Sequence, residues 1–432
     1  MSPRSPAFMM LFAVSLTAAA GNMALQSVLP AIGREFRLSD TLVAGAFALS
    51  ALLWTVTSPF WARLSDRLGR KRVILIGLIG FVLSMSGFGL AASLGLSGVL
   101  GATVAFTLMA VARAVYGLFG SAAPIASQAY VADRTGPESR TEAMSMLASA
   151  QGLGTVIGPA LAPFFVLPFV GLAGPMYAYA LLGLVVLIVV WRNLPSGDVT
   201  RKTAEAGEAA SDKGLWKDPR VRDFLLYGLL VTGAQAINIA VLGFHIIDEL
   251  AAEGRTSAAA AQPYIGVAML AGAAATLMVQ WGLIPALHMK PRELMRWGAV
   301  LALLGNVLSV FGPGYYGVVV GYAVVSMGVG FARPGFTAGS SLAVSGREQG
   351  AIAGLIMSLA GLSFLAPPVL GVALYELAEP APFLANVVLL AIAVGLAFLR
   401  PTLSADEPAA ATAPSAPGPA SQPGPEGSRP TR

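Results

Sequence analysis

The most constraining feature of this sequence is a succession of long apolar runs that fills most of the chain. Crossing about 30 Å of hydrocarbon takes roughly 20 helical residues. Because lipid offers no partner for backbone N–H and C=O groups, each run of this length is predicted to be a helix. Twelve runs qualify: Phe8–Ile32, Leu42–Phe60, Val73–Leu94, Val99–Ser127, Ala143–Phe165, Ala173–Trp191, Phe224–Ile247, Tyr264–Leu287, Trp297–Phe311, Tyr315–Ala338, Gly350–Leu374 and Phe383–Leu399. Membrane helices tolerate Gly and Pro, so Gly158-Pro159 and Pro367-Pro368 do not change the assignment of these runs as spans.

Composition supports an all-α integral membrane protein. The chain is 56% hydrophobic and 11% charged, with a mean hydropathy of +0.73, whereas a soluble chain of 432 residues needs a far more polar surface. The absence of Cys excludes disulfides and thiolate metal sites, and two His argue against a His-based site. No nucleophile–base set stands out, so we expect neither an enzyme nor a cofactor.

The N-terminus resembles a signal peptide in one respect. Arg4 precedes an apolar run that contains the small residues Ala18-Ala19-Ala20-Gly21. The run continues to Ile32, which is too long for a signal peptide, so we expect it to be retained as the first membrane helix.

The distribution of basic residues predicts the orientation. With the N-terminus inside, 22 of the 27 Lys and Arg fall in inside segments, and only Arg34, Arg37 and Arg255 fall outside. The remaining two, Arg113 and Arg333, lie within runs. This bias predicts a multi-pass protein of the bacterial inner membrane with both termini cytoplasmic. It also explains the net charge of +5 without a nucleic-acid partner.

The chain divides into two halves. Residues 1–192 and 224–400 each hold six runs, and the polar segment 193–223 between them is predicted to be a cytoplasmic linker. Within it, Trp216-Lys217-Asp218-Pro219 is a candidate short interfacial piece. The tail, residues 401–432, is dense in Pro, Ala, Ser and Gly and is expected to be disordered.

An internal repeat supports this division. The polar turn Thr135–Arg140 before the fifth run parallels Ser345–Gly350 before the eleventh. Gly158–Ala162 and Pro367–Gly371 keep nearly the same spacing. The repeat predicts two pseudo-symmetric six-helix bundles with a substrate site at their interface.

A basic turn between the second and third runs reads Asp66-Arg67-Leu68-Gly69-Arg70-Lys71. From charge alone it is a topology anchor. Gly69 permits a turn that returns Arg70 toward the helix ends. The order of residues resembles the G-x-x-x-D-R-x-G-R-K/R loop of the major facilitator superfamily, with Ala62 in place of the first Gly.

That resemblance implies a cytoplasmic gate. In the family, the matching Asp and Arg form a clamp that stabilises the outward-open state, a role that falls here to Asp66 and Arg70, with Arg67, Gly69 and Lys71 in the same motif. Asp133 is the expected acceptor for Arg70. The element Ala132-Asp133, followed by Gly-Pro-Glu-Ser-Arg, resembles the drug/proton antiporter branch that includes the tetracycline exporters.

Arg113 lies in the middle of the fourth run, where a charge costs at least about 2.5–3.5 kcal/mol. Arg113 and Gly117 resemble the family's second motif, with Tyr116 in place of a frequent Gln. Two interpretations stay open. Arg113 acts in coupling or substrate binding, or it ties helices together through backbone carbonyls.

The fifth run contains Gly154-Thr155-Val156-Ile157-Gly158-Pro159, which resembles the G-x-x-x-G-P motif of the antiporter branch. Two Gly four residues apart let another helix approach closely, and Pro159 bends the helix. The family's trailing Gly pair is replaced by Ala162-Pro163. The motif favours an exporter over an importer.

Other polar residues are candidates for the cavity or for coupling. All 22 Asp and Glu fall outside the middles of the runs, so a cavity with Arg113 should be electropositive and suit an anionic or zwitterionic substrate. Arg333 either joins this cavity or snorkels to the interface. His245 is the best titratable candidate for the proton, or else a plain interfacial His. Further candidates, from their position in the runs, are Asn22, Gln26, Gln151, Gln235 and Asn238.

Together these features predict a monomeric secondary active transporter that exports a small organic molecule by alternating access, through proton-coupled antiport. The alternative is a proton-coupled or facilitated importer of an organic anion. A non-transporting membrane sensor would need a soluble signalling domain, and neither the linker nor the tail has the composition to fold into one. The expected partners are the substrate, protons and the lipid bilayer.

Overall fold

The computed structural model describes residues 5–135, 137–196, 214–254, 260–345 and 348–404, and these residues form helices and turns without a strand. The helices of the first part are α1 Pro6–Glu35, α2 Asp40–Leu68, α3 Arg70–Leu96, α4 Ala102–Phe119, α5 Ala122–Arg134, α6 Pro137–Leu161, η1 Ala162–Phe165, η2 Gly171–Ala173 and α7 Gly174–Asn193. Those of the second part are η3 Leu215–Lys217, α8 Pro219–Ala252, α9 Gln262–Leu277, η4 Met278–Leu283, α10 Ile284–Leu287, α11 Pro291–Phe311, α12 Gly314–Leu342, α13 Gln349–Ser363, α14 Pro367–Leu377, α15 Ala381–Leu399 and α16 Pro401–Ser404.

Eleven helical stretches of the described chain are long and apolar enough to cross a membrane, so this is a multi-pass membrane protein. The predicted fifth run, Ala143–Phe165, corresponds to α6, which is not among the eleven. This 25-residue helix starts with a polar turn and carries Ser, Gln and Thr along its length, which makes it less apolar than its neighbours. The predicted number of twelve spans therefore stays a prediction.

Two predicted runs are interrupted. The fourth is divided into α4 and α5 at Gly120-Ser121, and the eleventh into α13 and α14 before Pro367-Pro368. The assignment of this run as one span is unaffected, since Gly354–Leu377 is among the eleven stretches. Two successive Pro residues remove two backbone donors and clash with the preceding turn, so the helix restarts with them at its first positions. Pro159 lies inside α6, but the chain changes to the 3₁₀ turn η1 soon after it.

The predicted linker is partly helical. The helix α8 begins at Pro219, inside the segment expected to be linker, because Asp218 caps it by accepting from Arg220 N at 2.9 Å. The short interfacial piece expected around Trp216 overlaps η3. The rest of the linker, 197–213, and most of the tail, 405–432, lie outside the described residues. The domain boundaries stay predictions.

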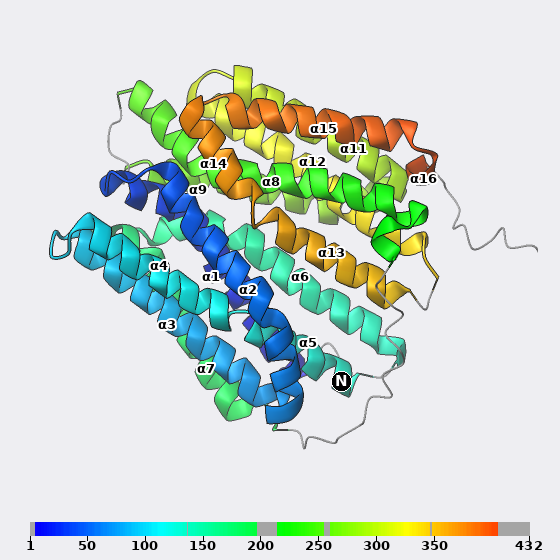
Figure 1. The fold of residues 1–432 in the computed structure, drawn as a ribbon, viewed down its shortest axis with the longest axis horizontal. Helices are drawn as coiled ribbons and strands as arrows, with labels where there is room; N and C mark the ends of the chain where they lie inside the picture. Colours follow the sequence, from blue (N-terminus) through cyan, green and yellow to red (C-terminus); the bar gives the residue numbers. More distant parts are fainter. Residues whose placement is uncertain (1–4, 136, 197–213, 255–259, 346–347, 405–432) are drawn as a thin grey trace, which may run out of the picture.

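The helices gather into two groups. The N-terminal group is α1–α7, in which α1 packs on α6 and α3 on α4, and the C-terminal group is α8–α15, in which α11 packs on α12 and α8 on α14. Figure 1 shows the first group at the lower left and the second at the upper right. Contact between the groups comes mainly from α6 with α9, α2 with α14 and α1 with α8.

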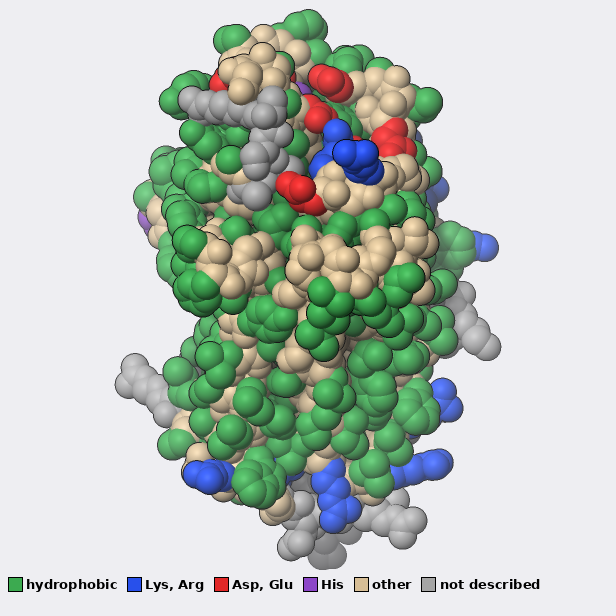
Figure 2. All heavy atoms as spheres, turned by 90° about the vertical axis from the view of Figure 1, so that its left-hand side faces the viewer, with side chains coloured by type: hydrophobic (Ala, Val, Ile, Leu, Met, Phe, Trp, Pro, Cys, Tyr) green, Lys and Arg blue, Asp and Glu red, His purple; other side chains and the backbone are tan. Residues whose placement is uncertain are grey.

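The two ends of the helices carry different charges. The end that holds Arg34, Asp40 and Asp248 is called here the acidic end, and the end that holds Arg70 and Arg220 is called the basic end. Figure 2 shows acidic side chains beside basic ones in its upper part and a wide, largely hydrophobic surface below them. Among the charged side chains, only basic ones are visible near the lower edge. An apolar band between two charged ends matches a molecule that crosses a bilayer.

The tight contact of α6 with α1 explains the two glycines of the fifth run. A Cβ at Gly154 would lie 2.5 Å from Leu16 O, and one at Gly158 would lie 2.2 Å from Ala20 O. Both glycines face the backbone of α1, so only a residue without a side chain permits this approach. Gly152, on another face of α6, has open space where its Cβ would be.

We therefore expect Gly158→Ala to lower the free energy of unfolding by about 1–3 kcal/mol, because α1 must move away from the new methyl group. The measurement is thermal unfolding of the purified protein in a fixed detergent. Gly152→Ala is the matched control on the same helix and should leave the unfolding temperature nearly unchanged. Equal unfolding temperatures for the two variants would contradict the close approach.

Candidate functional site

The basic turn forms an ion-pair cluster at the basic end. Gly69 ends α2 with φ of 91°, a left-handed conformation that suits Gly and lets α3 start at once. Arg70, the first residue of α3, places Nη1 2.5 Å from Asp66 Oδ1 and Nε 2.9 Å from Asp133 Oδ2. The Asp66 and Asp133 side chains expected around Arg70 thus lie within its reach.

This cluster belongs to the N-terminal group alone. Arg70 joins α2, α3 and α5, and Lys71 Nζ donates to Trp191 O of α7 at 2.8 Å. Asp66 and Asp133 are 63% and 48% exposed, so the pairs add little to stability, about 0–1 kcal/mol each. Arg67 is exposed at the surface. The arrangement therefore orders the helix ends of one group.

The C-terminal group has a cluster of its own at the same end. Arg220 Nη2 lies 2.7 Å from Asp218 Oδ2 and 3.1 Å from Glu348 Oε1, which joins the start of α8 to the start of α13. The hydrogen bond from Arg220 lowers the pKa of Asp218. Hydrogen bonds from Ser345 and then from Arg220 lower the pKa of Glu348. Both carboxylates therefore stay ionised at neutral pH, which keeps this cluster formed.

Arg113 is buried in the N-terminal group, with 2% of its surface exposed. Its Nη2 donates to Asn22 Oδ1 of α1 at 3.0 Å. The guanidinium lies over the rings of Phe47 and Tyr116, at 4.9 and 5.1 Å. Its Nε and Nη1 have no hydrogen-bond partner among the described residues. One neutral acceptor and two ring faces thus surround a full positive charge.

One of the two interpretations left open for Arg113 was that it ties helices together through backbone carbonyls. The hydrogen bond that it makes goes instead to a side-chain amide. Tyr116 is also buried and donates to Ala18 O at 3.4 Å. Asn22, Phe47 and Tyr116 come from α1, α2 and α4, so Arg113 lies between three helices of one group. Whether it contacts substrate or acts in coupling stays a prediction.

The remaining polar candidates do not converge on Arg113. Gln26 is buried on α1, and Gln151 is half-buried on α6. On α8, Gln235 has a buried Oε1 without a partner, and Asn238 donates to Ala234 O at 3.0 Å. A polar cluster that sequence analysis missed lies close to these, where Asn386 Nδ2 donates to Ala234 O and to Asn306 Oδ1 at 3.2 and 3.1 Å.

His245 and Arg333 have contrasting surroundings. His245 is 6% exposed, its ring lies 6.0 Å from that of Tyr375 and 5.0 Å from that of Phe383, and neither ring nitrogen has a described hydrogen-bond partner. It is therefore a core residue of the C-terminal group and not an interfacial one. Arg333 is exposed on α12.

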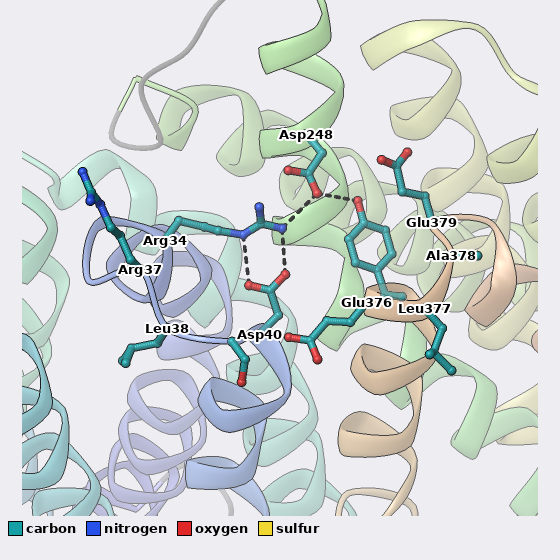
Figure 3. Close-up of a pocket in the computed structure, with 11 residues that line it drawn as sticks. Arg34, Arg37, Leu38, Asp40, Asp248, Glu376, Leu377, Ala378 and Glu379 are labelled. Carbon is teal, nitrogen blue, oxygen red and sulfur yellow. Dashed lines mark hydrogen bonds and ion pairs between the residues drawn. The ribbon is translucent and has the colours of Figure 1, made fainter.

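A third ion-pair cluster joins the two groups at the acidic end. Arg34, at the end of α1, binds Asp40 of α2 through Nε at 2.9 Å and Nη2 at 2.7 Å. The same Nη2 donates to Asp248 of α8 at 3.0 Å, and Tyr375 of α14 donates to that carboxylate at 2.8 Å. Figure 3 shows the guanidinium between the two carboxylates.

A further contact lies beside it. Glu376 of α14 accepts from Thr41 N at 3.1 Å and from Thr41 Oγ1 at 2.5 Å. We call Arg34, Asp40, Thr41, Asp248, Tyr375 and Glu376 the acidic-end lock. It borders a cavity of about 670 Å³ that is also lined by Arg37 and Glu379.

The lock binds one group to the other, unlike the clusters at the basic end. Arg34 and Thr41 make polar bonds from the N-terminal group to the C-terminal group. Close apolar contacts lie on the same side, since a Cβ at Gly243 would be 2.7 Å from Pro30 Cγ. The molecule is thus closed at its acidic end. In the sequence these acids stand only at or near the ends of apolar runs. Their meeting depends on how α1, α8 and α14 pack, which no single run indicates.

Known proteins resemble this chain along most of its length. Residues 11–289 match the Major Facilitator Superfamily. Multidrug resistance protein 2 of Bacillus subtilis (strain 168) is 25% identical over 378 residues, 85% of this chain and 88% of the relative. The class G tetracycline resistance protein of Vibrio anguillarum is 26% identical over 386 residues, 86% of this chain and 91% of the relative.

A solved structure has the same fold. The human organic anion transporter MFSD10 (TETRAN) superposes with a TM-score of 0.59 at 19% identity, over 91% of this chain and 100% of that chain. The resemblance that the basic turn suggested is thereby confirmed. The family match spans both the basic turn and Arg113, and on it rests the conclusion that this chain belongs to the Major Facilitator Superfamily of membrane transporters.

Proposed function

We propose that this transporter exports a small organic molecule across the bacterial inner membrane, by alternating access and in exchange for protons. Relatives of similar length are multidrug and tetracycline resistance proteins, which favours export. The fifth-helix motif supports the same direction, because Gly154 and Gly158 hold α6 against α1 as the antiporter branch implies.

The architecture that we propose has twelve spans in two six-helix bundles, with α6 as the fifth span. It packs along α1, and its length of 25 residues suffices to cross a bilayer. The positive-inside rule then makes the basic end cytoplasmic, with both termini on that side. The acidic end faces outward.

The observation that carries the mechanism is the position of the bonds between the groups. They lie at the acidic end, whereas the clusters of Arg70 and Arg220 each stay within one group. A transporter closed on its outer side presents its centre to the cytoplasm, where an exporter takes up substrate. Release then requires that the acidic-end lock opens and that the basic end closes.

In this mechanism Asp66, Arg70 and Asp133 order the cytoplasmic ends of α2, α3 and α5 so that they can meet the other group. Arg113 is held between α1, α2 and α4, so a shift of α1 against α4 changes its environment. We assign Arg113 to coupling between these helices. The protein acts as a monomer, because each chain holds both groups.

The direction of transport is tested by overexpression in a bacterial host. An exporter should lower cellular accumulation of its substrate and raise resistance, and uptake into everted vesicles should depend on an imposed pH gradient. The measurement is accumulation across a panel of drugs and organic anions. Increased cellular uptake of an organic acid would instead establish the importer alternative.

The lock is tested by spin-label distances, since the chain has no native Cys. Labels at Ser97→Cys and Ala251→Cys lie at exposed outer ends of α3 and α8. Asp248→Asn removes the ion pair between the groups, so longer distances should become more populated. Glu379→Gln is the matched control, because Glu379 lines the same cavity and makes none of the bonds of the lock. An unchanged distribution in Asp248→Asn would show that other contacts keep the outer side closed.

The cytoplasmic cluster is tested by Asp66→Asn, which should reduce transport while leaving membrane insertion and the unfolding temperature nearly intact, since the pair is exposed. Arg70→Asp alone should also reduce transport. Combining it with Asp133→Arg exchanges the two charges and should recover part of the activity that the single substitution loses. If Asp66→Asn transports as well as the wild type, the basic turn is only a topology anchor.

A further inference from the structure

We propose that Arg333, with Thr337 on the same face of α12, forms a subsite that binds the anionic group of the transported molecule inside the central cavity. This inference rests on the proposed transport function and names the chemical class of the substrate. The position of Arg333, the face it occupies and its lack of a counter-charge each support it.

Arg333 lies in the half of α12 that is nearer the basic end. It precedes the last residue of the helix, Leu342, by more than two turns, or about 13 Å. A guanidinium at such depth is costly when it faces lipid. Arg333 is nevertheless exposed, as is Thr337 one turn further on, so both face water in a cavity or lipid.

The packing of α12 decides between cavity and lipid. Its lipid face is marked near the other end by Tyr316 and Val320, which are 80% and 54% exposed. At 3.6 residues per turn, Arg333 lies about 100–140° around the helix from these two residues. The face of Arg333 is therefore not the lipid face.

The flanking contacts place the same face toward the interior. Phe336 packs against Gly228 of α8, and Gly330 packs against Val279, which follows α9. Around the helix, Arg333 comes between these two contacts. Its side chain is thus directed between α8 and α9, and α8 and α9 are helices of the C-terminal group that contact the N-terminal group. Arg333 therefore opens onto the space between the groups.

Arg333 has no anionic partner among the described residues, which form seven ion pairs without it. Arginine does not lose its proton in proteins, so the charge persists. Arg113 differs, because it is enclosed by Asn22, Phe47 and Tyr116 and leaves no room for a ligand. Of the two intramembrane cations, Arg333 is the one that a solute can reach.

The chemistry of the face defines the ligand. The planar guanidinium donates two parallel hydrogen bonds to a carboxylate, sulfonate or phosphate, and the Thr337 hydroxyl adds a donor one turn away. The substrate class that fits is an organic anion or zwitterion.

The experiment uses the absence of native Cys. Thr337→Cys places one thiol beside Arg333 in the full-length protein in dodecyl maltoside. The rates of its modification are measured with anionic sulfonatoethyl methanethiosulfonate and cationic trimethylammonioethyl methanethiosulfonate. Arg333→Gln should lower the anionic-to-cationic rate ratio about tenfold, the effect in water of a unit charge about 6 Å away on reagents of opposite sign.

Three controls accompany it. Arg333→Lys should keep the ratio, and Arg192→Gln, which removes an exposed cation on α7, should not change it. Val388→Cys, on a face of α15 that is 60% exposed, should react slowly with both reagents because it faces the detergent.

This experiment tests the subsite independently of the proposed function, because it measures thiol modification and not transport. An unreactive thiol in the Thr337→Cys variant, or a ratio that Arg333→Gln leaves unchanged, would overturn the subsite even if export is established. Loss of the anionic preference on adding phosphatidylglycerol to the micelles would assign Arg333 to a lipid headgroup and also overturn it.

Discussion

The closed state of this protein depends on the guanidinium of Arg34, which is shared between a carboxylate of its own helix group and one of the other group. The bidentate pair with Asp40 fixes its orientation, and the remaining donor on Nη2 then meets Asp248 at 3.0 Å. Because Tyr375 donates to the same Asp248 oxygen, the bond between the groups is supported on both sides. These bonds therefore hold the two helix groups together at the acidic end.

A closure at one end fits the different roles of the charged clusters. Arg70 pairs with exposed carboxylates and the exposed Arg220 pairs with half-buried ones, each inside its own group, and such surface pairs add little stability. Their value lies in ordering helix ends that are free to move as a unit. Arg34, in contrast, loses its second partner when the groups separate. The energetic cost of opening is therefore concentrated at the acidic end, where bonds must break, and not at the basic end.

The sequence predicted the parts of this structure that follow from local rules. Helix positions follow from the length of apolar runs, and the meeting of Asp66, Arg70 and Asp133 was expected from the resemblance to the family's loop motif. The eleventh run was identified by its length, although the helix is broken before Pro367-Pro368. The acidic-end lock, in contrast, was missed. Its members come from α1, α2, α8 and α14, and no periodicity in one helix indicates which residues of another it will face.

The two intramembrane arginines show why depth alone does not assign a role. Both are costly at their positions when they face lipid, and the sequence left two interpretations open for each. The positive charge of Arg113 is stabilised by Asn22 and two aromatic faces within a single group. Its environment therefore depends on how α1, α2 and α4 pack against one another. In the subsite proposed above, the exposed Arg333 side chain faces the space between the groups. When the groups rock about a central site, the surroundings of Arg113 change through its own helices, whereas those of Arg333 change through whatever occupies the cavity. In the proposed mechanism, an anion bound at Arg333 shifts the equilibrium between the two states only by the difference between its affinities for them.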